Sequence, residues 1–254
     1  MTDTRRPDAR NADARTRRPA SRVWWLVFVA ILAVLGMLWG WMSQRPPEQY
    51  TPGPLAAAPT PSPTPTIPEI ARQEVWTSDT KPSGQYLTNT ITLEPAIAAP
   101  TTVPYVLQVE DTTEVDADEA ARAVQATFDD ERGWAGYGKR NFQLVTDPEQ
   151  AELTIYITSP DTSNELCQPL DVASKWNCRV EDRVVLNSDR WKYMTPTYDD
   201  LGVYRSYLVN HEVGHFLGQG HVGCPKEGAV APVMMQQSIE LDGCVPNAWP
   251  RDAD

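Results

Sequence analysis

The eleven residues His211–His221 read HEVGHFLGQGH and contain all three histidines of the 254-residue chain. Residues four apart lie on one face of an α-helix, so His211 and His215 can direct imidazole nitrogens at a single cation. Gly218 can adopt a positive φ, which ends the helix and turns the chain so that His221 supplies a third nitrogen. The spacing therefore predicts a helix followed by a sharp turn, built around a metal site.

Three neutral imidazoles suit Zn²⁺, and three protein ligands leave a fourth position for water. Glu212 follows His211 directly, so it lies beside the predicted site without being one of its ligands. Zinc lowers the pKa of a bound water, and a nearby carboxylate can accept the proton and pass it to a leaving amine. The motif therefore predicts hydrolysis of peptide bonds, with Zn²⁺ as cofactor and Glu212 as general base.

The sequence before the motif switches between strand-like and helix-like patterns. Strands are predicted at residues 103–110, 141–145, 152–157 and 184–187, the last within a run that begins near Arg179, and an edge strand at 171–175. Helices are predicted at 117–130, after the capping residue Asp116, and from Asp199 and Asp200 to Gly218. This order predicts an α+β domain in which one long helix packs beneath a mixed sheet.

The charge of the chain changes sharply near residue 42. Residues 1–22 carry seven Arg against three Asp, residues 23–42 carry no charge, and the remainder carries 15 basic and 31 acidic residues. The acidic remainder excludes a nucleic-acid-binding body, which requires clustered Lys and Arg. A 20-residue helix spans about 30 Å, the thickness of the hydrocarbon layer, and tryptophans stand at both ends of this segment. We therefore predict a transmembrane anchor at 23–42 that contacts the lipid bilayer.

The regions on either side of this segment predict the topology. An Arg-rich tail at 1–22 favours a cytoplasmic N-terminus, which places the C-terminal domain outside the cell. A cleaved signal peptide is the alternative, but its apolar region would be about 7 to 15 residues long and followed by a small-residue cleavage site. Nine prolines within 46–68 predict a semi-rigid extracytoplasmic stalk over 43–69, followed by one domain at 70–254. The excess of Arg over Lys, 17 to 5, favours a bacterial source.

The motif resembles the HExxHxxGxxH signature of the metzincin metalloproteases, and five residues carry the match: His211, Glu212, His215, Gly218 and His221. The segment Ala231–Gln236, APVMMQ, resembles the methionine-bearing turn of that family, with Met234 as the counterpart of its methionine. The resemblance implies a metzincin-like fold over about residues 103–235. Together, the anchor, stalk and short domain resemble an actinobacterial family of membrane-anchored, metzincin-like proteins whose function is uncharacterised.

One departure from the metzincin pattern follows the turn methionine. Many metzincins place a Tyr or Pro there to shape the substrate pocket or steady the oxyanion, whereas Met235 and Gln236 follow Met234 in this chain. The resemblance therefore leaves open which group, besides zinc, stabilises the transition state.

All four cysteines lie in the predicted outer domain, which fits an oxidising compartment and two disulfides. Four cysteines allow three pairings. We favour Cys167 with Cys178 and Cys224 with Cys244, because each pair closes a short local loop.

Several less specific interpretations compete with this one. Cys224 could complete a closed, purely structural zinc site, and Met234 and Met235 could simply fill a core. Aromatic side chains could line a cleft or pack in the interior; they are Trp134, Tyr137, Trp176, Trp191 and Tyr193.

The sequence therefore predicts a membrane-anchored, extracytoplasmic zinc metallopeptidase that acts on a peptide or protein substrate. Two alternatives remain open. One is a catalytically silent zinc-binding surface module, and the other is an amidase that acts on cell-wall peptides.

Overall fold

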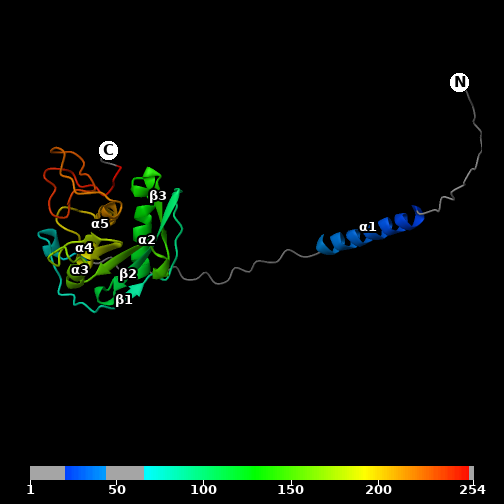
Figure 1. Ribbon diagram of the computed structural model, residues 1–254, viewed down its shortest axis with the longest axis horizontal. Helices are drawn as coiled ribbons and strands as arrows, with labels where there is room; N and C mark the ends of the chain where they lie inside the picture. Colours follow the sequence, from blue (N-terminus) through cyan, green and yellow to red (C-terminus); the bar gives the residue numbers. More distant parts are fainter. Residues whose placement is uncertain (1–20, 44–65, 252–254) are drawn as a thin grey trace, which may run out of the picture. The chain divides into compact units, whose positions relative to one another are not determined.

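Two stretches of the chain, residues 21–43 and 66–251, are described by the computed structural model (Figure 1). The chain divides into two units after Ser62, within the predicted stalk. The first unit contains helix α1, and the second contains every other helix and strand of the described residues. Residues 1–20 of the predicted cytoplasmic tail at 1–22, and most of the predicted stalk at 43–69, lie outside the described residues.

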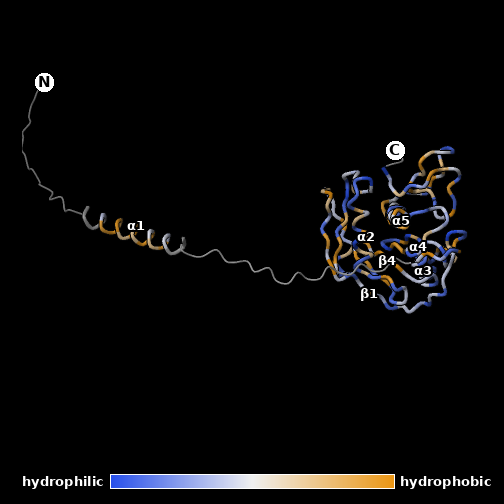
Figure 2. Tube along the Cα trace, turned by 180° about the vertical axis from the view of Figure 1, so that it is seen from behind, coloured by the Kyte–Doolittle hydropathy of each residue, from blue (hydrophilic) through white to orange (hydrophobic). Residues whose placement is uncertain are grey.

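Helix α1 covers Ser21–Ser43. Its described side chains, at residues 25–40, are almost all exposed. Most residues of this stretch are hydrophobic (Figure 2). The predicted membrane segment at 23–42 extends past these side chains at both ends. Among the described residues, no helix has the length and hydrophobicity that crossing a bilayer requires.

The second unit is built on a six-stranded mixed sheet in the order β1-β2-β4-β6-β5, with β3 paired to β2 beside β1. The strands are β1 (Tyr86–Thr88), β2 (Thr101–Glu110), β3 (Arg140–Leu144), β4 (Leu153–Thr158), β5 (Cys178–Val180) and β6 (Arg183–Asn187). Strand β2 pairs in parallel with β3 and β4, and β4 pairs in parallel with β6. The antiparallel pairs are β1 with β2 and β5 with β6, so the predicted mixed sheet is confirmed.

Four helices accompany the sheet: α2 (Ala117–Phe128), α3 (Pro160–Leu166), α4 (Ser188–Tyr193) and α5 (Leu201–Phe216). Short 3₁₀ turns lie at Glu69–Arg72, Asp111–Thr113, Trp134–Tyr137 and Pro148–Gln150. The carboxylate of Asp116 accepts a hydrogen bond from the Glu119 amide, and that of Asp200 accepts one from the Val203 amide. These caps satisfy backbone donors that a helix start leaves unpaired, which explains why α2 and α5 begin where the sequence predicts.

Successive side chains of a strand point to opposite faces of the sheet, so apolar side chains lie on both faces. On β4, Ile155 and Ile157 join the main core with residues of α2, α4 and α5, whereas Tyr156 packs in a smaller cluster on the opposite face. On β6, Val184 and Leu186 face the main core, and Val185 joins the smaller cluster. Residues of α2, α4 and α5 therefore cover one face, whereas Leu166 at the end of α3 packs with the smaller cluster on the other face. The mixed sheet with several helices confirms the predicted α+β class.

The strand predicted at 171–175 is wrong, because these residues form a turn. Ala173 and Ser174 have φ of 53° and 54°, and the Asp171 carboxylate accepts a hydrogen bond from the Ala173 amide. Such local side-chain bonding competes with an extended backbone. The edge strand is β5, separated from β6 by a turn at Glu181, whose φ is 55°.

Both disulfides join the favoured partners. Cys167 is bonded to Cys178, with Cα atoms 5.9 Å apart, and Cys224 is bonded to Cys244, with Cα atoms 5.8 Å apart. The first closes the loop between α3 and β5, and the second closes the loop between His221 and the C-terminal segment.

Candidate metal centre

Helix α5 supplies two of the three histidines. Its middle is held in the main core by Tyr204, Leu208 and Val213, each no more than 1% exposed. The Tyr207 hydroxyl also donates a hydrogen bond to the Met235 carbonyl, 3.0 Å away, which ties the helix to the segment after the third histidine. The buried packing therefore fixes where His211, one turn after Tyr207, can lie.

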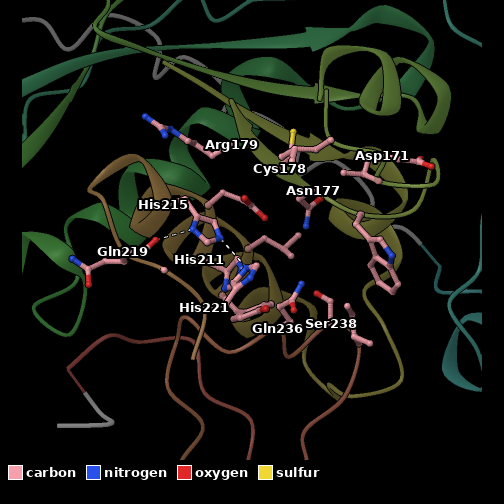
Figure 3. Close-up of a pocket in the computed structure, with 18 of the residues that line it drawn as sticks. Asp171, Asn177, Cys178, Arg179, His211, His215, Gln219, His221, Gln236 and Ser238 are labelled. Atoms are coloured by element: carbon pink, nitrogen blue, oxygen red, sulfur yellow. Dashed lines mark hydrogen bonds between the residues drawn. The ribbon is translucent and has the colours of Figure 1, made fainter. Parts of the chain in front are cut away.

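The chain turns back at Gly218 after α5 ends. Gly218 has φ of 89°, a left-handed conformation that side chains with a Cβ rarely adopt. The turn carries His221 to the end of the helix, where its Nε2 lies 3.2 Å from Nε2 of His211 and 3.0 Å from Nε2 of His215 (Figure 3). Their candidate ligand atoms lie within 4.8 Å of one another. The structure thus brings the three predicted ligands together.

Backbone carbonyls orient two of the imidazole rings. Nδ1 of His211 lies 2.8 Å from the Val233 oxygen, and Nδ1 of His215 lies 2.9 Å from the Gln219 oxygen. Because a carbonyl oxygen only accepts, each Nδ1 must carry the proton, which leaves the lone pair of Nε2 free. Burial also lowers the pKa of His211 to about 3, so this ring stays neutral.

This arrangement fits a zinc ion. In a tetrahedral site with zinc–nitrogen bonds of about 2.05 Å, ligating nitrogens lie about 3.3 Å apart, close to the spacing of the Nε2 atoms. The lone pairs of unprotonated nitrogens that face one another repel, whereas a cation placed between them is attracted to each lone pair. The donor set therefore suits Zn²⁺, although a histidine cluster by itself does not identify the metal.

Glu212 lies beside the histidines with a side chain only 5% exposed. Burial raises the pKa of Glu212 to about 8, because the charged carboxylate is poorly solvated there. A divalent cation next to the carboxylate favours the ionised form and lowers that pKa again. The group can therefore take up and release a proton near neutral pH, as a general base requires.

Met234 packs beneath the ligand helix. A Cβ at Gly214 would clash with the Met234 sulfur and would lie 2.9 Å from the Trp134 ring, so the helix and the turn approach closely only because residue 214 is glycine. Met235 lies in a separate cluster with Ala231 and Cys244. The structure therefore places Met234, not Met235, against the metal-binding helix.

The closed zinc site with Cys224 as fourth ligand is wrong, because the Cys224 sulfur is bonded to Cys244. A cleft of about 580 Å³ opens instead beside the histidines and Glu212. Its other walls come from the disulfide-closed loop, from β5 and from the segment after Met235.

Several cleft residues have no motif that could have singled them out. These are Leu170, Val172, Asn177, Arg179 and Ile239. Among the five aromatic candidates, Trp176 lines the cleft, whereas Trp191 is buried in the main core. Trp134 packs against that core beside Gly214, Tyr137 donates a hydrogen bond to the Pro250 oxygen, and Tyr193 makes an edge-to-face contact with Trp76.

Comparison with known proteins adds a family but no activity. No curated protein matches the sequence. The model of one family matches residues 79–249, which include the whole sheet, the ligand helix and both disulfides. The chain therefore belongs to the family described as Protein of unknown function (DUF3152).

Proposed function

We propose that this protein is a zinc-dependent metallopeptidase with a metzincin-like active site. One observation carries the proposal: three imidazole Nε2 atoms converge beside a buried carboxylate, at the wall of an open cleft. A purely structural zinc site is normally closed by four protein ligands, whereas a catalytic site keeps one position free.

In this proposal, different residues bind the metal, transfer the proton and orient the ligands. His211, His215 and His221 would hold Zn²⁺. When bound, the ion would lower the pKa of water and polarise the carbonyl of the substrate. Glu212 accepts the proton of the attacking water and delivers it to the amine when the peptide bond breaks. The carbonyls of Val233 and Gln219 keep two imidazoles in the tautomer that can ligate.

The metzincin-like fold is part of the proposal. Its support is the order of elements, with a mixed sheet over a long helix that carries two ligands, a glycine turn to the third, and Met234 beneath that helix. The cleft beneath the edge strand would accept an extended peptide, so the substrate is a protein or a peptide, including peptides of the cell wall.

The proposal is tested with the purified full-length chain, a pool of fluorogenic peptides and isolated wall peptides. We expect cleavage that a chelator abolishes and Zn²⁺ restores. Glu212→Gln should retain one zinc and the fold, because Glu212 is not a ligand, while kcat falls by about 10²- to 10⁴-fold. Glu74→Gln, at an exposed glutamate far along the chain from the motif, is the matched control and should keep full activity.

Two results would contradict the proposal. If fully metallated wild-type protein cleaves no member of either pool, the zinc-binding surface module takes its place. Equal cleavage by wild type and Glu212→Gln would remove Glu212 as the general base.

A further inference from the structure

Asn177 stands at the point where the disulfide-closed loop enters β5, and its side chain lines the same cleft as Glu212 and the three histidines. Neither the histidine motif nor the turn methionine includes it. Because this chain departs from the metzincin pattern after Met234, no residue has yet been assigned to stabilise the oxyanion that develops during hydrolysis. A side-chain amide on the wall opposite α5 is a candidate for that role, because amide N–H groups serve as oxyanion donors.

One hydrogen bond fixes which way the Asn177 amide faces. Its Oδ1 accepts from the backbone N–H of Asn187 at 2.8 Å. Because a backbone N–H only donates, the oxygen must face Asn187, and Nδ2 with its two protons must face the other way. Figure 3 shows the Asn177 nitrogen directed into the cleft, to the right of the histidines in this view.

Asn187 is a rigid support for this amide. It is fully buried, its Nδ2 donates to the Ser174 oxygen at 3.1 Å, and its Oδ1 accepts from the Asp189 amide at 2.9 Å. On the other side of Asn177, Cys178 is bonded to Cys167 and pairs with Val185 in the sheet. The donor is therefore held in place before any ligand arrives, which is the condition under which a hydrogen bond contributes most to a transition state.

The other side-chain amides of the cleft lack this support. Gln219 and Gln236 are exposed, and within the described residues no hydrogen bond holds their side-chain amides. Figure 3 shows the Arg179 guanidinium directed away from the histidines. Asn177 is thus the cleft amide whose direction the fold determines.

We propose that Asn177 is a catalytic residue whose Nδ2 donates a hydrogen bond to the oxygen of the scissile carbonyl. This inference rests on the proposed peptidase function. Water adds to the carbonyl carbon, its proton goes to Glu212, and the π electron pair moves to the oxygen that Asn177 contacts. The pair returns as the C–N bond breaks, and the amine leaves with the proton from Glu212.

Asn177→Asp tests this role with little change of shape. The aspartate still accepts the Asn187 N–H, but an acceptor replaces the donor in the cleft. We expect kcat to fall by about 10²- to 10³-fold with KM nearly unchanged. Asn177→Ala, which removes the donor without adding a charge, should lose a similar factor.

Binding gives a second readout that does not depend on turnover. A phosphinic peptide carries a tetrahedral centre with a charged oxygen, so its Kd for the zinc-containing protein should weaken by the same factor in both variants. Asn164→Asp is the matched control, because Oδ1 of Asn164 accepts the Val172 amide of the same loop at 2.9 Å but does not line the cleft. Its zinc content, kcat and phosphinate Kd should equal those of wild type.

Three results would overturn the assignment, and they are distinguishable. Wild-type kcat and phosphinate affinity in both Asn177 variants would remove Asn177 while Glu212 keeps its role. A raised KM with unchanged kcat would show that Asn177 binds the substrate equally well in the ground state and the transition state, and so is a binding residue and not an oxyanion donor. If wild type with full zinc neither cleaves peptides nor binds the phosphinate, the peptidase function fails, and the role of Asn177 fails with it.

Discussion

At the residue scale, the tightest packing of the candidate site is between Gly214 and Met234. Gly214 lies on α5 between His211 and His215, and its missing side chain makes room for the Met234 sulfur and the Trp134 ring. Met234 follows Val233, whose carbonyl orients His211. A larger side chain at residue 214 should therefore displace the metal ligands, although residue 214 does not bind the metal itself.

Gly214→Ala should weaken zinc binding by about 10- to 100-fold, the range typical of changes to groups that orient metal ligands. Overpacking should also lower the free energy of unfolding by about 1–3 kcal/mol. Competition with a chromophoric chelator measures the first quantity. Gly202→Ala, on the first turn of the same helix, should leave zinc affinity unchanged, and adding Met234→Ala to Gly214→Ala should restore part of it. Unchanged zinc affinity in Gly214→Ala would show that this packing does not position the ligands.

At the scale of elements, Glu110 joins the end of β2 to two other segments of the chain. Its buried carboxylate accepts hydrogen bonds from the amides of Ser83 and Ser159 at 2.7 and 2.8 Å, and from the Thr162 hydroxyl at 2.9 Å. The Gly84 amide donates at 3.1 Å. Burial by itself would raise the pKa of Glu110, but the hydrogen bonds from Gly84, Ser159 and Ser83 outweigh it and lower the pKa below its usual value.

Glu110→Gln should lower the free energy of unfolding at pH 7 by about 1.5–3 kcal/mol, the range for hydrogen bonds to a charged group. Because the folded-state pKa lies below the unfolded one, the contribution is complete above the unfolded pKa and is lost as pH falls through the folded pKa. Urea unfolding of both proteins from pH 7 downward should therefore show the difference shrinking in acid. Glu131→Gln, at an exposed glutamate, should match wild type throughout. A difference that does not change with pH would mean that the charge of Glu110 is not what holds the segments.

At the scale of the whole molecule, the charge asymmetry of the sequence predicts the topology. Seven arginines precede residues 23–42, and the acidic remainder follows them. Protease added to intact cells should therefore cut in the proline-rich segment, release the domain and leave a stub that sediments with membranes after carbonate extraction. A C-terminus that is protected until the cells are lysed would contradict this orientation.

Patterns between near neighbours were enough to predict much of the molecule. A helix repeats every 3.6 residues and a strand every two, so α2, α5, β2 and β4 follow from local periodicity and from the capping residues Asp116 and Asp200. The histidine spacing predicts that His211 and His215 share a helix face for the same reason. The favoured disulfide pairing also rests on near neighbours, because each pair closes a local loop, but four cysteines allow three pairings and the structure decides among them.

Longer-range features were decided by the tertiary structure. The order of the strands brings Asn187 against Asn177, and the return of the chain after His221 places the Val233 carbonyl against His211 and Met234 under Gly214. No local pattern specifies such pairs, because each depends on where two distant segments meet. The strand predicted at 171–175 was wrong for a local reason. The Ala173 amide donates a hydrogen bond to the Asp171 carboxylate, and this bond stabilises a turn in place of a strand. The sequence by itself thus determined which side chains can hold a metal, and the packing of distant segments decided which carbonyls, amides and apolar groups surround it.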